Sequence, residues 1–150
     1  MVEHSEQIKA ESRLLAALAH GSVILQGMGM LVGVLVYVTQ REKSRFAAFQ
    51  ALQAAVYQLI TMIVIMAMWV LWGACYALSF IPLIGLPEDA PPPPIFWVGL
   101  GSMVIPLAVM ALFGLYGLWA ALRVWQGRDF RYALIGAWLE RSGLWKNNAA

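Results

Sequence analysis

The chain has 150 residues, of which 61% are apolar and only 12% are charged, with a net charge of +2. A soluble domain carries about a quarter charged residues and just under half apolar ones. The composition therefore excludes an ordinary soluble protein and predicts an all-α integral membrane protein. Charged residues are absent from 14–40, 46–87 and 90–122, and about 20 apolar residues are enough for a helix to cross a bilayer.

Residues 1–13, "MVEHSEQIKAESR", mix acidic, basic and apolar side chains. They lack the basic region, the short apolar region and the cleavage site of a secretory signal peptide, so we do not expect this segment to be removed. The amphipathic pattern predicts a short helix that lies in the membrane interface.

The first apolar segment, residues 14–38, is expected to be a membrane span. Near its middle, "QGMGMLVG" places Gly27, Gly29 and Gly33 close together. We expect the segment to cross the bilayer fully, which puts the N-terminus outside. The alternative is a broken helix or a re-entrant hairpin with both ends inside, because irregular backbone survives at membrane depth only where protein covers it.

Charge and hydropathy define the other segments of this single membrane domain. A basic loop precedes the second span, and a proline-rich loop without Lys or Arg precedes the third. Short loops rich in Lys and Arg stay in the cytoplasm. We therefore predict a multi-pass protein of the inner (cytoplasmic) membrane, with the basic loop and the C-terminus in the cytoplasm. The expected segments are the basic loop 39–45, span 46–80, the proline-rich outside loop 81–94, span 95–124 and an interfacial tail, 125–150, that contains a short amphipathic helix.

Polar and small residues within the spans are expected to face other helices, because such residues usually point into the bundle. Helical steps of 100° align them into stripes within each span. The glutamines at the start of the second span are expected to lie in the headgroup layer. We favour the interpretation that they contact a neighbouring helix over the alternative that they line a ligand site or a translocation path. Pro106 is expected to kink the third span. The predicted helix-packing residues are Ser22, Gln26, Gly29, Gly33, Gln50, Gln53, Tyr57, Gly99, Ser102, Pro106 and Gly117.

His20 lies inside the first span, and no second histidine, cysteine or acidic residue stands at metal-ligand spacing from it. The favoured interpretation is a hydrogen bond to a neighbouring helix; the alternative is an axial ligand of a haem or chlorin, since one imidazole suffices. Cys75 is expected to be a buried small residue. No carboxylate lies within a span, and no catalytic, phosphate-binding or metal motif is present, so neither an enzyme nor a metal site is expected.

Three stretches resemble a known family: "ESRLLAALAHGSVI", then "SRFAAFQALQAAVYQL" after a basic loop, and the closing "GRDFRYALIG". They resemble small bacterial membrane proteins of unknown function that are similar to the Tic-twenty component of the chloroplast inner-envelope translocon, over about residues 11–140. The resemblance implies a small helical bundle and, for the chloroplast relatives, a part in a protein-conducting complex. His20 and Gln53 match the family pattern. Gln50 replaces the histidine of its Phe-His pair, which argues against a role that needs two imidazoles.

Three functions are compatible with these patterns. The favoured one is a non-enzymatic accessory subunit that packs against a larger membrane complex, because the spans carry small-residue stripes and no reactive cluster. The second is a Tic-twenty-like component of a protein-translocation or conduction pathway, and the third is a pigment or haem carrier that uses His20. The expected partners are membrane lipids and other integral membrane subunits, not nucleic acid, and no resident cofactor is expected.

Overall fold

The computed structural model describes residues 9–87 and 89–142, and within these ranges every regular element is a helix. Among the described residues, three segments are long and apolar enough to cross a membrane: Ala10–Gln40, Arg45–Leu83 and Pro94–Trp125. The predicted class, an all-α membrane protein with three such segments, is therefore confirmed. The chain divides into two compact units, residues 1–62 with 114–150, and residues 63–113.

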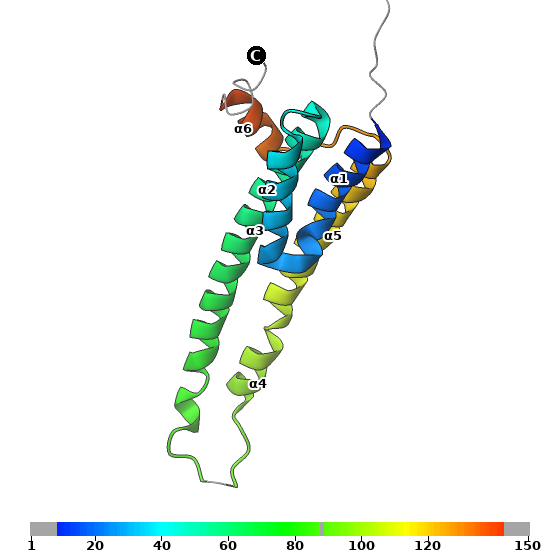
Figure 1. The fold of residues 1–150 in the computed structure, drawn as a ribbon. Coiled ribbons are helices and arrows are strands. Elements are labelled where there is room, and N and C mark those ends of the chain that lie inside the picture. Colours follow the sequence, from blue (N-terminus) through cyan, green and yellow to red (C-terminus); the bar gives the residue numbers. More distant parts are fainter. Residues whose placement is uncertain (1–8, 88, 143–150) are drawn as a thin grey trace, which may run out of the picture. The chain divides into compact units, whose positions relative to one another are not determined.

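In the first unit, the first apolar segment folds back on itself. Helix α1 (Ala10–Gly21) leads into the 3-10 turn η1 (Ser22–Met28), and helix α2 (Gly29–Gln40) returns beside α1 (Figure 1). Each helix has 12 residues and is about 18 Å long, whereas the hydrocarbon core is about 30 Å thick. The segment expected at 14–38 is thus a helical hairpin and not one continuous helix, which agrees with the broken-helix alternative.

The backbone of η1 shows why the helix breaks here. Gln26 has φ 54° and ψ −135°, a conformation that strains any residue except glycine. The Ser22 hydroxyl lies 2.8 Å from the Ala19 carbonyl oxygen and 3.0 Å from that of Gly29, so it ties the end of α1 to the start of α2. A Cβ at Gly29 would overlap the Ser22 carbonyl oxygen. Glycine is therefore required for the two helices to approach so closely.

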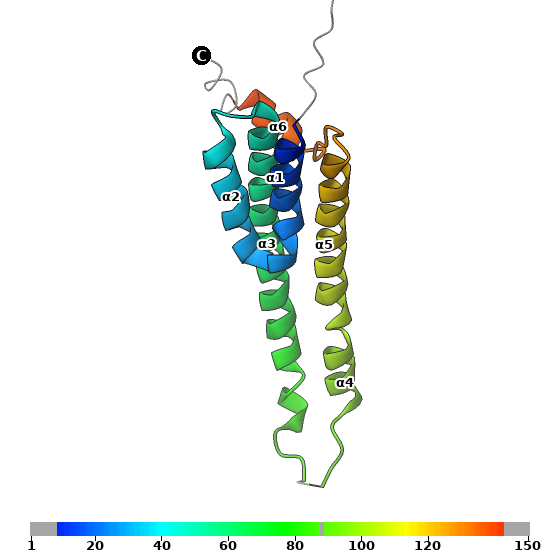
Figure 2. The same cartoon turned by 45° about the vertical axis from the view of Figure 1, so that its right-hand side comes forward.

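Helix α3 (Arg45–Leu78) and the last turns of helix α5 (Val104–Trp125) pack against the hairpin, with α2 next to α3 and α1 next to α5 (Figure 2). The contacts are made by small residues. A Cβ at Gly33 would lie 3.1 Å from Ala55 Cβ on α3, and one at Gly117 would lie 2.9 Å from the Val23 side chain. These helices are held together by close backbone approach, as is usual for helices within lipid.

Beyond α5, residues 128–132 form an extended segment, which we call the strap, and helix α6 (Ile135–Arg141) follows. Gly127 turns the chain out of α5 with φ 77°, a value that glycine adopts without strain. Phe130 and Tyr132 of the strap and Leu139 of α6 are buried. The short helix expected in the tail corresponds to α6, whereas 143–150 lie outside the described residues.

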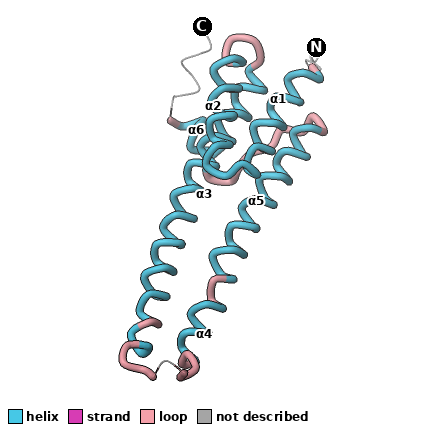
Figure 3. Tube along the Cα trace, turned by 60° about the horizontal axis from the view of Figure 1, so that its bottom comes forward, coloured by secondary structure: helices cyan, strands magenta, loops and turns pink. Residues whose placement is uncertain are grey.

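The second unit contains the second half of α3, the 3-10 turn η2 (Ile81–Leu83), helix α4 (Pro94–Gly101) and the start of α5. The predicted span 95–124 is interrupted at Ser102 and Met103 (Figure 3). Pro106 explains the position of the break, because its nitrogen cannot donate to the Ser102 carbonyl and its ring crowds that carbonyl. The helix is thus interrupted one turn before Pro106, where a kink was expected.

Two other predicted packing residues lie at contacts within this second unit. A Cβ at Gly99 would stand 2.8 Å from the Tyr76 ring of α3. The indole nitrogen of Trp72 donates to the Ser102 hydroxyl at 3.1 Å, and that hydroxyl donates to the Gly99 carbonyl at 2.6 Å. The start of the third apolar segment is thus joined to α3 by one hydrogen-bonded chain and one close glycine contact.

Gly29→Ala is expected to destabilise the hairpin by about 1–3 kcal/mol, because the added methyl group overpacks the turn against the Ser22 carbonyl. Gly114→Ala is the matched control, since nothing lies within 4 Å of a Cβ at that position. Unfolding of the micelle-bound protein in increasing SDS, followed by circular dichroism, measures both variants. Equal unfolding midpoints would contradict the tight turn.

Candidate functional site

Two glutamines of α3 bind the strap. Gln50 and Gln53 have no exposed surface (0%), although their sequence position suggests the hydrated headgroup layer. They lie three residues apart, so both side chains project from the same face of α3. The Gln50 amide nitrogen donates to the Phe130 carbonyl at 3.0 Å and to the Asp129 carboxylate at 2.8 Å. Both of its hydrogens are therefore used by the strap.

Gln53 pairs with the strap in the way that a neighbouring β-strand would. Its amide nitrogen donates to the Phe130 carbonyl at 3.2 Å, and its amide oxygen accepts the Tyr132 backbone N–H at 3.2 Å. A buried backbone group without a partner costs about 1–3 kcal/mol. One carboxamide thus satisfies the backbone of an extended segment that has no strand beside it in the described part of the chain.

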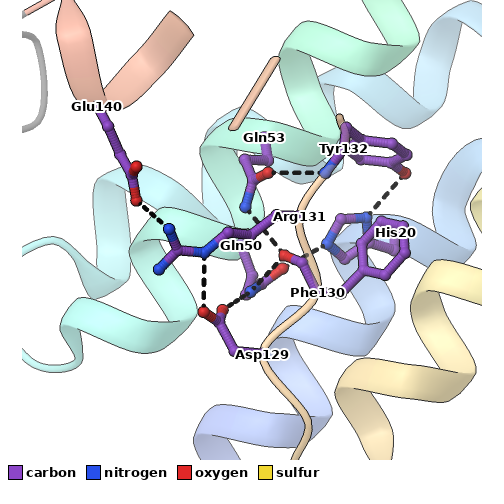
Figure 4. A network of polar contacts seen from close by, with 8 residues as sticks. All are labelled: His20, Gln50, Gln53, Asp129, Phe130, Arg131, Tyr132 and Glu140. Atoms are coloured by element: carbon purple, nitrogen blue, oxygen red, sulfur yellow. Dashed lines mark hydrogen bonds and ion pairs between the residues drawn. The ribbon is translucent and has the colours of Figure 1, made fainter. Parts of the chain in front are cut away.

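His20 connects α1 to both of these elements (Figure 4). Its ring is 1% exposed, with Nε2 3.1 Å from the Gln50 amide oxygen and Nδ1 3.1 Å from the Tyr132 hydroxyl. Because an amide oxygen can only accept, Nε2 carries the proton and donates, and Nδ1 accepts from the tyrosine. Burial raises the pKa of Tyr132. The Tyr132 hydroxyl therefore stays protonated and can donate to His20 Nδ1.

Aromatic rings cover the hydrogen bonds. Tyr57 of α3 stacks on Tyr132 with ring centres 4.3 Å apart and planes 6° apart. Phe130 meets Tyr132 edge-on at 4.9 Å and Trp119 of α5 at 5.4 Å. Each pair of this kind contributes roughly 0.5–1.5 kcal/mol beyond the area it buries. The strap is therefore packed between α3 and α5 and does not lie loosely on their surface.

The outer edge of this network is charged. Arg131 donates to the Asp129 carboxylate at 3.0 Å and forms an ion pair with Glu140 of α6. The hydrogen bond to Asp129 raises the pKa of Arg131. Exposed ion pairs add little stability. The pair between Arg131 and Asp129 nevertheless orients the Asp129 carboxylate, so that its second oxygen accepts a hydrogen bond from the Gln50 amide. The ion pairs thereby join α6 to the buried network.

A third glutamine of α3 binds the hairpin instead of the strap. The Gln58 amide nitrogen donates to the Ala19 carbonyl at 2.9 Å and to the Ser22 hydroxyl at 3.2 Å. Its amide oxygen is buried without a partner among the described residues and lies 2.5 Å from the place where a Cβ of Gly29 would stand. Gln58 thus anchors the turn of the hairpin to α3.

The structure brings most of the residues predicted in the first unit into contacts, although Gln50 and Gln53 bind mainly the strap where a neighbouring helix was expected. Gln26 is the exception, because the prediction assumed a straight helix, whereas the break at η1 leaves its side chain exposed. Cys75, expected to be buried, is also exposed. Predicted residues of this unit that lie at the hairpin, the strap or a helix contact are Ser22, Gly29, Gly33, Gln50, Gln53, Tyr57 and Gly117.

The polar residues of this site form hydrogen bonds that hold the helices and the strap together. Both nitrogens of His20 are engaged, so an axial bond to a haem or chlorin would require Gln50 or Tyr132 to move away. The described residues contain no group of three or more His, Cys, Asp or Glu side chains that could hold a metal ion. The pigment interpretation of His20 therefore gains no support from the geometry.

The strap is the part of the site that the sequence interpretation missed. We expected the partners of Gln50 and Gln53 on a neighbouring helix, but most are backbone groups of the strap. The signal was present, because Phe130 and Tyr132 alternate with charged residues directly after Gly127. Such alternation indicates an extended segment with one buried face.

Comparison with known protein families gives a match over most of the chain. Residues 11–139 match the magnetosome magnetite crystal formation protein family, and this range contains the hairpin, the three glutamines of α3 and the strap. No curated protein and no solved structure matches the chain. Nothing in these comparisons supports the expected resemblance to the Tic-twenty component.

Gln53→Leu is expected to release the strap, because the Tyr132 N–H loses its acceptor and a buried unpaired group costs about 1–3 kcal/mol. Hydrogen–deuterium exchange of the peptide that contains 128–134 should become at least about tenfold faster. The matched control is Gln126→Leu, since Gln126 is exposed. Equal exchange in the two variants would show that Gln53 does not hold the strap.

Proposed function

Because the chain belongs to the magnetosome magnetite crystal formation protein family, we propose that it is a non-enzymatic membrane subunit that acts in magnetite crystal formation. The family match spans the hairpin, α3 and the strap, so the proposal concerns the same residues that build the buried network. The chain would contribute as an integral part of the membrane around the crystal, and not through a reaction of its own.

The observation that carries the non-enzymatic role is that the buried polar side chains of the site bind one another. Gln50, Gln53 and His20 direct their donors and acceptors to the strap and to each other, which leaves them no group aimed at a substrate. A translocation path along the glutamine stripe is disfavoured for the same reason, because the strap covers it. Such a network fixes the arrangement of helices, as a subunit that docks on partners requires.

The proposed location is a magnetosome membrane, with the basic loop 39–45 and the C-terminus in the cytoplasm. This orientation follows from the excess of Lys and Arg in those segments. The loop 81–94, which contains Glu88 and Asp89 but no Lys or Arg, would then face the opposite compartment. The proposed partners are membrane lipids and other integral membrane subunits, because many large apolar side chains of α3 and α5 are exposed.

The role in crystal formation is tested in a magnetite-forming strain whose own copy of this family member has been deleted. Electron microscopy is expected to show crystals of altered size or number, and expression of the chain should restore them. A double variant, Gln50→Leu with Gln53→Leu, should restore less, because its strap is released. Crystals that are unchanged by the deletion would contradict the proposed function.

The role as a subunit is tested separately by gentle solubilisation of native membranes, followed by separation by size. The chain is expected to migrate with a complex much larger than its own 16.6 kDa. Its exposed apolar surface supports this expectation, since large apolar surfaces in spans meet either lipid or other subunits. Migration as a lone monomer in several mild detergents would count against a partner complex.

A further inference from the structure

An apolar groove of about 590 Å³ lies between α1 and α5 in the first unit. Leu14 and Leu18 of α1 and Leu118 of α5 line it. The two helices approach closely beside it, since a Cβ on Gly21 would lie 3.8 Å from Ala121 Cβ. Its other lining residues reach the hairpin turn, so the groove follows α1 over its last turns. Its walls offer apolar contacts and almost no hydrogen-bonding groups.

A smaller hollow of about 160 Å³ lies at the start of α1 and is lined by Ala10, Arg13 and Trp125. Trp125 also lines the groove, so the two spaces share this side chain. The Arg13 side chain lies against Gly127. A Cβ at Gly127 would stand 3.2 Å from the Arg13 Cδ atom and 3.3 Å from its Nη1 atom. The absence of a side chain at Gly127 thus leaves room for the guanidinium at the mouth of the groove.

The mouth is positively charged. Arg13 is partly buried and forms no ion pair with any residue that the structure describes. Lys9 directly precedes α1 and adds a second basic residue near this end, whereas Glu11 stands two residues from Arg13 and projects from a different side of the helix. Tryptophan and arginine side chains favour the level where acyl chains meet headgroups. A cation that has no ion pair among the described residues therefore lies beside an apolar groove, next to the Trp125 ring.

The lining of the groove and the charge at its mouth together indicate its occupant. The groove itself is almost entirely apolar, whereas the partly buried Arg13 beside Trp125 adds a positive charge at one end. An acyl chain is a thin apolar rod that fits such a groove, and the anionic phosphate of its headgroup complements Arg13. We propose that the groove between α1 and α5 binds one acyl chain of an anionic phospholipid, with the lipid phosphate held by Arg13.

The first test measures lipid binding to the purified full-length protein by native mass spectrometry. Micelles contain equal amounts of phosphatidylglycerol and phosphatidylcholine, and wild type is expected to retain mainly phosphatidylglycerol. Arg13→Gln should lower the retained phosphatidylglycerol about fivefold, the effect of one basic side chain near an anionic lipid. Arg41→Gln, in the exposed basic loop, is the matched control and should retain it. An equal loss in both variants, or a loss in neither, would overturn the proposal.

The second test changes the groove and not the charge. Leu18 is 52% exposed and lines the groove, so Leu18→Trp should fill the space without disturbing the core, which circular dichroism checks. This variant is expected to lose bound phosphatidylglycerol although Arg13 is intact, and an excess of inorganic phosphate should not displace the lipid from wild type. Unchanged lipid retention in Leu18→Trp, or displacement by phosphate alone, would show that the acyl chain is not bound there.

Discussion

The first unit depends on pairing the backbone groups that leave regular helices in its buried parts, because neither lipid nor an apolar core offers hydrogen bonds. The turn η1 and the buried strap create this demand. The turn η1 is satisfied by Ser22 and Gln58, and the strap is satisfied by Gln50 and Gln53. Three carboxamides on one helix thus supply partners both to the turn of a helical hairpin and to a buried extended segment.

These hydrogen bonds also explain the distribution of small residues. A carboxamide reaches a backbone carbonyl only if the two chains lie close, and that proximity leaves no space for a side chain at Gly29. The same applies to Gly136, where a Cβ would lie 3.0 Å from the Gln53 amide oxygen. Hydrogen bonding and close packing therefore depend on each other. Glycine lets the two chains lie close together, and the glutamine amide can then hydrogen-bond to the backbone.

The sequence predicted much of this structure, but not the contacts of the site. Apolar length predicted three helical segments, and the rules for proline indicated an irregular helix near Pro106, because both depend on local chemistry. The hairpin could not be chosen over a full crossing, since both have the same hydropathy and differ in whether other helices cover the turn. The partners of His20 lie 30 and 112 residues away, and neither spacing nor periodicity carries information over that distance.

The short hairpin has a consequence for the bilayer itself. If both ends of the hairpin lie at one face of the bilayer, helices of about 18 Å in a hydrocarbon layer of about 30 Å add their cross-section mainly to one leaflet. Lipids of that leaflet would then make way for two helices that barely enter the other. Many copies in one membrane would crowd a single leaflet and favour bending of the bilayer, with the crowded leaflet on the convex side.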